Sequence, residues 1–176
     1  MVFSQKLVFE GPTLIYVITP VFDMLPVFKK EDLAVEAALQ LENASNQHDL
    51  SVTAYCIMPS YMHAILASRE GLDLSEFIYS YKWLSSRAIM CMELSEFERQ
   101  LQRRGKFKLW MRRYDYSVMN SLKQFKARLD FIHNSPVKKE LVPNAEDWRF
   151  SSARDWLRDE HGLIKIEKDI SWFGLE

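Results

Sequence analysis

An α+β fold is predicted by two hydrophobic periodicities that alternate along the chain. Short β-branched or aromatic runs bounded by Gly and Pro are typical of strands, and they alternate with longer segments whose apolar residues recur every three or four positions. No internal repeat or low-complexity tract interrupts this order. We therefore expect an antiparallel sheet with helices packed on one face.

The first strand and the first helix are predicted within the first fifty residues. Residues 13–19 (TLIYVIT) follow a Gly-Pro pair and end at Pro20, as a strand between two breakers does. Residues 30–46 place Ala and Leu at helical spacing, with two acidic residues near the positive end of the helix.

A strand pair and a second helix are predicted next. Residues 51–58 and 62–68 are apolar runs around a short polar turn, too short for good helices and typical of adjacent strands. A helix is predicted from Leu74 to about Met92, with Asp73 as its N-cap. Its apolar stripe consists of Leu74, Ile78, Tyr81 and Leu84.

The remaining elements complete a ferredoxin-like order. Residues 106–119 predict one or two further strands, and residues 121–133 a third helix that Pro136 should end. The third helix carries a stripe of Leu122, Phe125, Leu129 and Ile132. Strand, helix, strand, strand, helix, strand and helix describe a ferredoxin-like α+β layer. We expect one domain over residues 1–156 and a C-terminal extension over residues 157–176.

Composition excludes several classes of protein. Hydrophobic residues make up 48% of the chain, which indicates a compact body, and no apolar run approaches the roughly 18 residues of a spanning helix. The N-terminus lacks the pattern of a secretory signal, so we expect a cytoplasmic protein. Cys56 and Cys91 lie in apolar segments without metal-finger spacing, and we expect buried, reduced thiols.

Charge is distributed unevenly along the chain. The net charge is −1, but residues 82–139 contain 14 Lys or Arg against 5 Asp or Glu. Such a basic centre suits a phosphate-binding face, because cations gain affinity by releasing counterions from a polyanion. A solvated charged surface without a ligand is the alternative.

Four segments carry a family resemblance. They are residues 58–66 (MPSYMHAIL), 109–115 (LWMRRYD), 129–137 (LDFIHNSPV) and 147–152 (DWRFSS). In this order they resemble the MPNHVHLL, VWQRRYYD, LDYIHLNPV and DWPWSS motifs of the REP-associated tyrosine transposases, a branch of the HUH single-strand transposases. The resemblance spans about residues 13–156.

The resemblance implies metal-assisted cleavage of DNA. In that family two His bind a divalent metal, Mg or Mn, that positions the scissile phosphate. The corresponding positions here are Tyr61 and His63, which strand alternation places on one face. A phenol must first lose a proton, with a pKa of about 10, to bind an ion as a neutral imidazole does. We therefore expect metal binding to be weak or absent.

The nucleophile position departs from the family as well. In the family a helix Tyr attacks the phosphate and forms a 5′-phosphotyrosine; its position here is Phe131, which has no oxygen. Ser135 stands where the family often has an Asn beside the metal, and Asn134 is displaced by one residue. Helical geometry turns Phe131 about 140° from the apolar stripe, as a residue facing an active site would be.

Structural roles compete with these assignments. His63 could be a structural residue of the sheet, Phe131 could pack under a neighbouring helix or subunit, and Tyr61 could be a half-buried aromatic. Tyr114 or Tyr116 could supply a displaced nucleophile, although in-line attack demands an oxygen within about 3 to 3.5 Å of phosphorus.

Cations interleaved with aromatic rings, the combination that holds single strands, mark the predicted recognition residues. These are Arg103, Arg104, Lys106, Lys108, Trp110, Arg112 and Arg113, with Phe107, Tyr114 and Tyr116 between and after them and with Lys123, Lys126 and Arg128 on the third helix. Strand alternation would place Lys106, Lys108 and Trp110 on one face. Alternatively, Trp110 and Phe107 belong to the core, and we expect this for at least one of them.

The sequence thus predicts a transposase-like protein that binds hairpin or single-stranded DNA, with strand cleavage impaired or lost, and that forms a homodimer as is usual in the family. An active transposase that uses a displaced Tyr, and an interaction protein that reuses the fold without DNA, are the alternatives.

Overall fold

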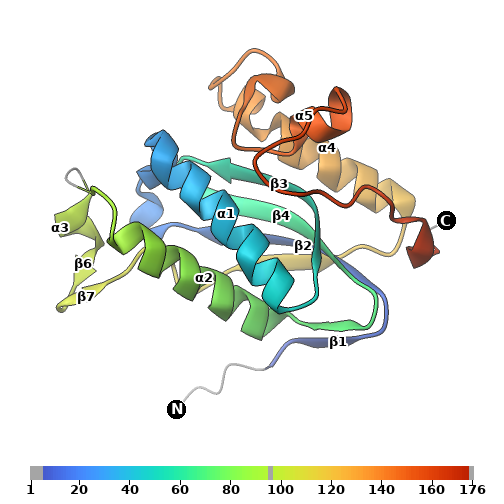
Figure 1. The fold of residues 1–176 in the computed structure, drawn as a ribbon, viewed down its shortest axis with the longest axis horizontal. Helices are drawn as coiled ribbons and strands as arrows, with labels where there is room; N and C mark the ends of the chain where they lie inside the picture. Colours follow the sequence, from blue (N-terminus) through green and yellow to red (C-terminus); the bar gives the residue numbers. More distant parts are fainter. Residues whose placement is uncertain (1–5, 95–96, 175–176) are drawn as a thin grey trace.

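The computed structural model describes residues 6–94 and 97–174. Its centre is a four-stranded antiparallel sheet, drawn in the middle of Figure 1. In spatial order the strands are β3 (Ser51–Met58), β4 (Tyr61–Ser68), β2 (Thr13–Pro20) and β8 (Asp115–Val118). The first and third of these strands along the chain, β2 and β4, are neighbours in the middle of the sheet. This is the split βαββαβ arrangement, so the predicted ferredoxin-like α+β class is confirmed.

Local sequence explains the strands. β2 is rich in β-branched and aromatic residues, and β3 and β4 form a hairpin in which Met58 is paired with Tyr61 across the Pro59-Ser60 turn. The outer edge of β3 is covered by the chain near Ser151, which forms a bridge with Cys56.

Helices lie on both faces of the sheet (Figure 1). α1 (Glu31–Gln47) and α2 (Leu74–Met90) pack on one face, as predicted. α4 (Leu122–Lys138) packs on the other, so the expectation of a single helical face is corrected for this helix. The physical reason is that both faces of the central strands are apolar: Ile15 and Val17 of β2 face α1 and α2, whereas Leu14 and Tyr16 face α4.

Shorter elements complete the structure. They are β1 (Val8–Glu10) paired with β5 (Gly71–Asp73), α3 (Glu98–Leu101), the small hairpin of β6 (Gln102–Arg103) and β7 (Lys106–Phe107), α5 (Ala153–Leu157), and the 3-10 turns η1 (Phe22–Met24), η2 (Val27–Lys29), η3 (Ala145–Asp147) and η4 (Ser171–Phe173).

Two predicted helix boundaries and the predicted burial of the two cysteines are tested by the structure. The Asp73 carboxylate accepts a hydrogen bond from the Glu76 N–H and caps α2, as expected. Pro136 lies in the last turn of α4 and does not end it, because the turn after it is held by the Lys139 N–H, which donates to the Ser135 carbonyl, and by the Leu141 N–H, which donates to the Pro136 carbonyl. Cys56 is buried as expected, but Cys91 is exposed, since it follows the last turn of α2.

The C-terminal segment packs against the domain. The Glu167 N–H donates to the Val52 carbonyl, and Ile164 is buried in the same core cluster as the apolar residues of α1 and α2. The boundary after residue 156 stays a prediction. Among the residues described, no helix is long and apolar enough to cross a membrane.

Candidate functional site

His63 is the centre of an aromatic cluster between the sheet and α4. Its side chain is fully buried. The ring centres of Tyr61, Phe131 and Tyr16 lie 5.4, 5.8 and 6.2 Å from its own, each in an edge-on arrangement. β4 thus supplies His63 and Tyr61, β2 supplies Tyr16 and α4 supplies Phe131.

The imidazole of His63 is held neutral. Burial, with a smaller contribution from His133, lowers the pKa of His63 to about 3. Neither ring nitrogen has a hydrogen-bond partner among the described residues. A neutral imidazole has one lone pair available for a ligand, and that lone pair is enclosed by rings.

Tyr61 and Ser135 lie beside the same cluster. Burial, and then the neighbouring Cys56 thiol, raise the pKa of Tyr61, whereas a hydrogen bond with Ser135 acts in the opposite direction. The Ser135 hydroxyl also donates to the Phe131 carbonyl at 2.7 Å. The structure therefore brings together all four positions singled out in the sequence, Tyr61, His63, Phe131 and Ser135.

This donor set does not fit a divalent metal. Mg and Mn take several oxygen or imidazole ligands at once. Here the candidates are one enclosed imidazole, a phenol whose pKa is raised and a hydroxyl that donates to the backbone. The described residues contain no group of three or more His, Cys, Asp or Glu that could hold an ion. Asn134 does not complete the set, because its amide donates to the Asp130 carbonyl at the exposed side of α4.

Neither Phe131 nor Tyr114 places a nucleophilic oxygen next to His63. Phe131 is 39% exposed, so one side of its ring faces solvent as the helical geometry predicted, but the ring is a phenyl. Tyr114 lies across the sheet from Phe131, where its hydroxyl is 3.5 Å from the Ser75 hydroxyl of α2. The structure therefore does not bring Tyr114 to the cluster around His63.

The predicted cationic side chains of residues 103–113 are exposed. They are Arg103, Arg104, Lys106, Lys108, Arg112 and Arg113. The Arg103 guanidinium pairs with Asp23 at 3.0 Å, at an exposed site where the pair contributes little stability. Lys123 and Lys126 are also exposed, but they lie on α4, on the opposite face of the sheet from α2.

Trp110 is a core residue, which corrects its assignment to DNA stacking. It is only 5% exposed, and its indole N–H donates to the Ser85 hydroxyl at 2.9 Å. β7 ends at Phe107, so strand alternation does not carry on to residue 110, and Trp110 turns inward while Lys106 and Lys108 point to solvent. The prediction that at least one of Trp110 and Phe107 lies in the core is confirmed.

Lys82 anchors the basic segment to α2. Its ammonium donates to the carbonyls of Met111, Arg112 and Arg113 at 2.8, 3.3 and 3.5 Å. Burial lowers the pKa of Lys82 to about 8. The ammonium thus holds a loop of the chain in place.

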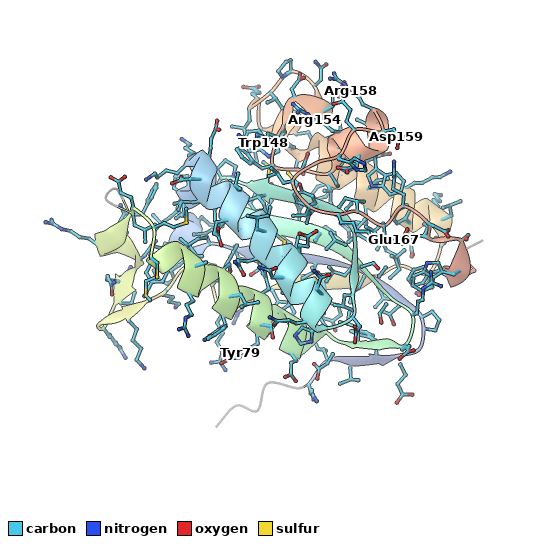
Figure 2. The ribbon with its side chains drawn as sticks, in the orientation of Figure 1. Tyr79, Trp148, Arg154, Arg158, Asp159 and Glu167 are labelled. Atoms are coloured by element: carbon cyan, nitrogen blue, oxygen red, sulfur yellow. The ribbon has the colours of Figure 1, made fainter. Side chains whose placement is uncertain are left out.

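Sequence reasoning missed three side chains of α2. Tyr79, Trp83 and Arg87 follow one another at four-residue intervals on an exposed face of the helix. Their signal was available, because aromatic residues outside the apolar stripe of a helix have no place in the core. Tyr79 lies beside α2, far from Trp148 and Arg154 (Figure 2), and its side chain is exposed.

A family model and two relatives of known sequence all match this chain to transposases. The family model described as "Transposase IS200 like" matches residues 25–135. The chain is 25% identical over 105 residues to a protein of Haemophilus influenzae assigned as a REP-associated tyrosine transposase, covering 60% of each chain. It is 27% identical over 118 residues to the REP-associated tyrosine transposase of Escherichia coli K12, covering 66% of this chain and 61% of that protein. The matches span about three fifths of these relatives.

Solved structures share the fold. The structure of a REP-associated tyrosine transposase bound to a REP hairpin aligns with a TM-score of 0.66 and 19% identity, over 96% of this chain and 94% of that chain. A structure assigned as a transposase from Deinococcus radiodurans R1 aligns with a TM-score of 0.50 and 20% identity, over 76% of this chain and 94% of that chain. Because the family model covers more than half of its residues, this chain belongs to the IS200-like transposase family.

Proposed function

We propose that this protein binds single-stranded or hairpin DNA and does not cut it. The observation that carries the proposal is the phenyl ring of Phe131, which lies 5.8 Å from the ring of His63 in the place of the family's attacking Tyr. Phosphotyrosine chemistry requires a nucleophilic oxygen and a polarised phosphate. Phe131 supplies no oxygen, and the residues around His63 do not form a metal site.

Binding, by contrast, depends on residues that are present. The exposed cations of residues 103–113 lie on a segment that α2 holds in place through Lys82. Clustered cations bind a polyanion by releasing counterions, and this requires neither a metal nor a nucleophile. The structural neighbour with the same fold is a complex with a REP hairpin, which supports a hairpin as the ligand to test. A DNA ligand agrees with the predicted cytoplasmic location.

We expect the wild-type protein to bind a labelled hairpin with a single-stranded tail and to form no covalent adduct in manganese. Affinity should fall as salt rises, with a slope of about −0.7 for each single-strand phosphate contacted. Fluorescence polarisation measures the affinity, and a denaturing gel detects the adduct. A protease-sensitive shifted band would contradict the proposal and point to a displaced Tyr. An absence of binding at low salt would favour an interaction protein without DNA.

Restored variants provide the matched controls for cleavage. Phe131→Tyr alone should remain inactive, because His63 and Tyr61 still leave the phosphate without a metal. Combining it with Tyr61→His and Ser135→Asn would restore the family's residue types at all three positions. The denaturing gel is expected to show a trace of adduct for the triple variant only. An adduct with Phe131→Tyr alone would show that cleavage lacks only the nucleophilic oxygen and that Tyr61 and Ser135 do not prevent it.

We also propose a homodimer related by a two-fold axis. β8 is an edge strand that pairs only with β2 among the described residues, and it leaves backbone groups available to a second sheet. Light scattering at micromolar concentration should give twice the chain mass of 20.8 kDa. A monomeric mass across a dilution series would contradict this prediction.

A further inference from the structure

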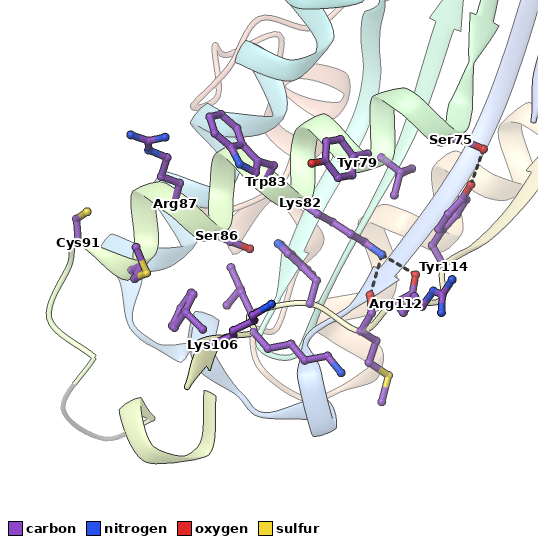
Figure 3. Close-up of a pocket in the computed structure, with 17 residues that line it drawn as sticks. Ser75, Tyr79, Lys82, Trp83, Ser86, Arg87, Cys91, Lys106, Arg112 and Tyr114 are labelled. Carbon is purple, nitrogen blue, oxygen red and sulfur yellow. Dashed lines mark hydrogen bonds between the residues drawn. The ribbon is translucent and has the colours of Figure 1, made fainter. Parts of the chain in front are cut away.

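A groove of about 920 Å³ lies between α2 and residues 106–114 (Figure 3). It is on the opposite face of the sheet from His63 and Phe131, since α2 packs on one face and α4 on the other. Trp110 and Leu109, both buried, contribute to its lining, whereas α2 contributes the exposed side chains of Tyr79, Trp83 and Arg87. The groove is thus separate from the site that resembles the family's catalytic centre.

Two aromatic rings in the groove are exposed without a structural role. Tyr79 is 70% exposed and Trp83 is 49% exposed, and neither belongs to a core cluster. They lie one turn apart on α2, so their rings follow one another along the groove. The Arg87 guanidinium lies over the Trp83 ring, 5.2 Å from its centre, which places a cation on one face of the more buried of the two rings.

All the charged side chains that line the groove around these rings are positive. Lys82, Arg87, Lys106, Lys108 and Arg112 line the groove, and no carboxylate is among its lining residues in the described part of the chain. Lys82 is occupied by backbone carbonyls. The salt bridges found between described residues involve none of the other four cations. These cations therefore remain available to an anion.

We propose that this groove holds the unpaired nucleotides of a bound DNA strand, with bases stacked on Trp83 and Tyr79 and phosphates beside Arg87, Lys106 and Lys108. This inference rests on the proposed DNA binding and names a site for it. Rings flanked by cations are what sequence-tolerant binding of single strands requires, because every base has a flat face and every nucleotide a phosphate. A paired stem presents its phosphates but not the faces of its bases, so stacking selects the unpaired part of the ligand.

The test compares a blunt hairpin with the same hairpin carrying a single-stranded tail. Wild type should bind the tailed probe more tightly than the blunt probe. Trp83→Ala should weaken binding of the tailed probe roughly 5- to 150-fold, as loss of one stacked base does, with little effect on the blunt probe. Trp83→Phe should retain most of the affinity. Arg87→Gln should reduce the salt slope by about 0.7.

Leu157→Ala is the matched control, because Leu157 is an exposed apolar side chain of α5, away from the groove. It should leave both affinities unchanged. If wild type binds both probes and Trp83→Ala binds the tailed probe equally well, the groove proposal is overturned and the proposed function stands. If wild type binds neither probe, the proposed function itself fails.

Discussion

Lowering the pH from 7 to 5 is expected to reduce the free energy of unfolding by about 4 kcal/mol, because two buried imidazoles must stay neutral in the folded protein. Burial lowers the pKa of His63 to about 3 and that of His133 to about 4, from an ordinary value of 6.5. Below pH 6.5 the unfolded chain binds protons that the folded chain cannot bind. The free energy of unfolding is therefore highest above pH 6.5, and protonation of each imidazole in the unfolded chain lowers it by about 2 kcal/mol at pH 5.

Urea unfolding at pH 7 and pH 5 measures this effect. His63→Leu removes one buried imidazole with little change in volume, so its loss of stability between the two pH values should be about half that of wild type. His161→Gln is the control, since His161 is exposed and its replacement should leave the full loss. Equal losses for wild type and His63→Leu would show that His63 does not titrate as its burial requires.

The sequence predicted the order of the elements because hydrophobic periodicity is a local property. Strands 51–58 and 62–68 and the Asp73 cap needed only their own residues and neighbours to be recognised. The face to which α4 packs was not a local property. A strand that is apolar on both faces, such as Thr13–Pro20, indicates that both faces of the sheet are covered, but it does not indicate which helix covers each face.

The residues of the candidate site could be predicted where a sequence motif fixes their alignment with the family. They could not be predicted where tertiary packing determines whether a side chain is buried or exposed. Tyr61, His63, Phe131 and Ser135 were located through the resemblance, and the structure brings them together. Alternation failed for Trp110, because β7 is only two residues long and the chain then bends towards Ser85. Trp83 lies outside the predicted apolar stripe of its helix, which already marked it as exposed, but only the structure shows that it lines a groove.

The two sides of the sheet have separate chemical characters. On the α4 side the positions of the resemblance form an aromatic cluster around His63, and burial keeps the imidazoles of His63 and of nearby His133 neutral. On the α2 side a groove combines exposed rings with cations. Substitutions in the cluster around His63 should leave the groove on the α2 side intact, because the two places share neither side chains nor hydrogen bonds among the described residues. This separation is what the proposed function requires, namely DNA binding that does not depend on the residues around His63.

Replacing Trp110 with Ala is expected to cost about 3 to 5 kcal/mol of stability, the range for truncation of a buried aromatic residue. The indole packs 5.4 Å from the rings of both Phe28 and Tyr81, and its N–H is bonded to Ser85. Truncation would open a cavity beneath the groove and release the chain at Leu109 from α2. Urea unfolding at pH 7 measures the loss, and DNA affinity should fall with it.

Two variants separate packing from recognition. Trp110→Phe keeps most of the ring volume and loses the hydrogen bond to Ser85, so it should cost only about 1 to 2 kcal/mol. Trp83→Ala should change stability by no more than about 0.5 kcal/mol, because Trp83 is half exposed and belongs to no core cluster. Both tryptophans line the groove, but Trp110 is buried and supports its floor, whereas Trp83 is half exposed and is proposed to contact the DNA. Equal losses of stability in Trp110→Ala and Trp83→Ala would contradict this division.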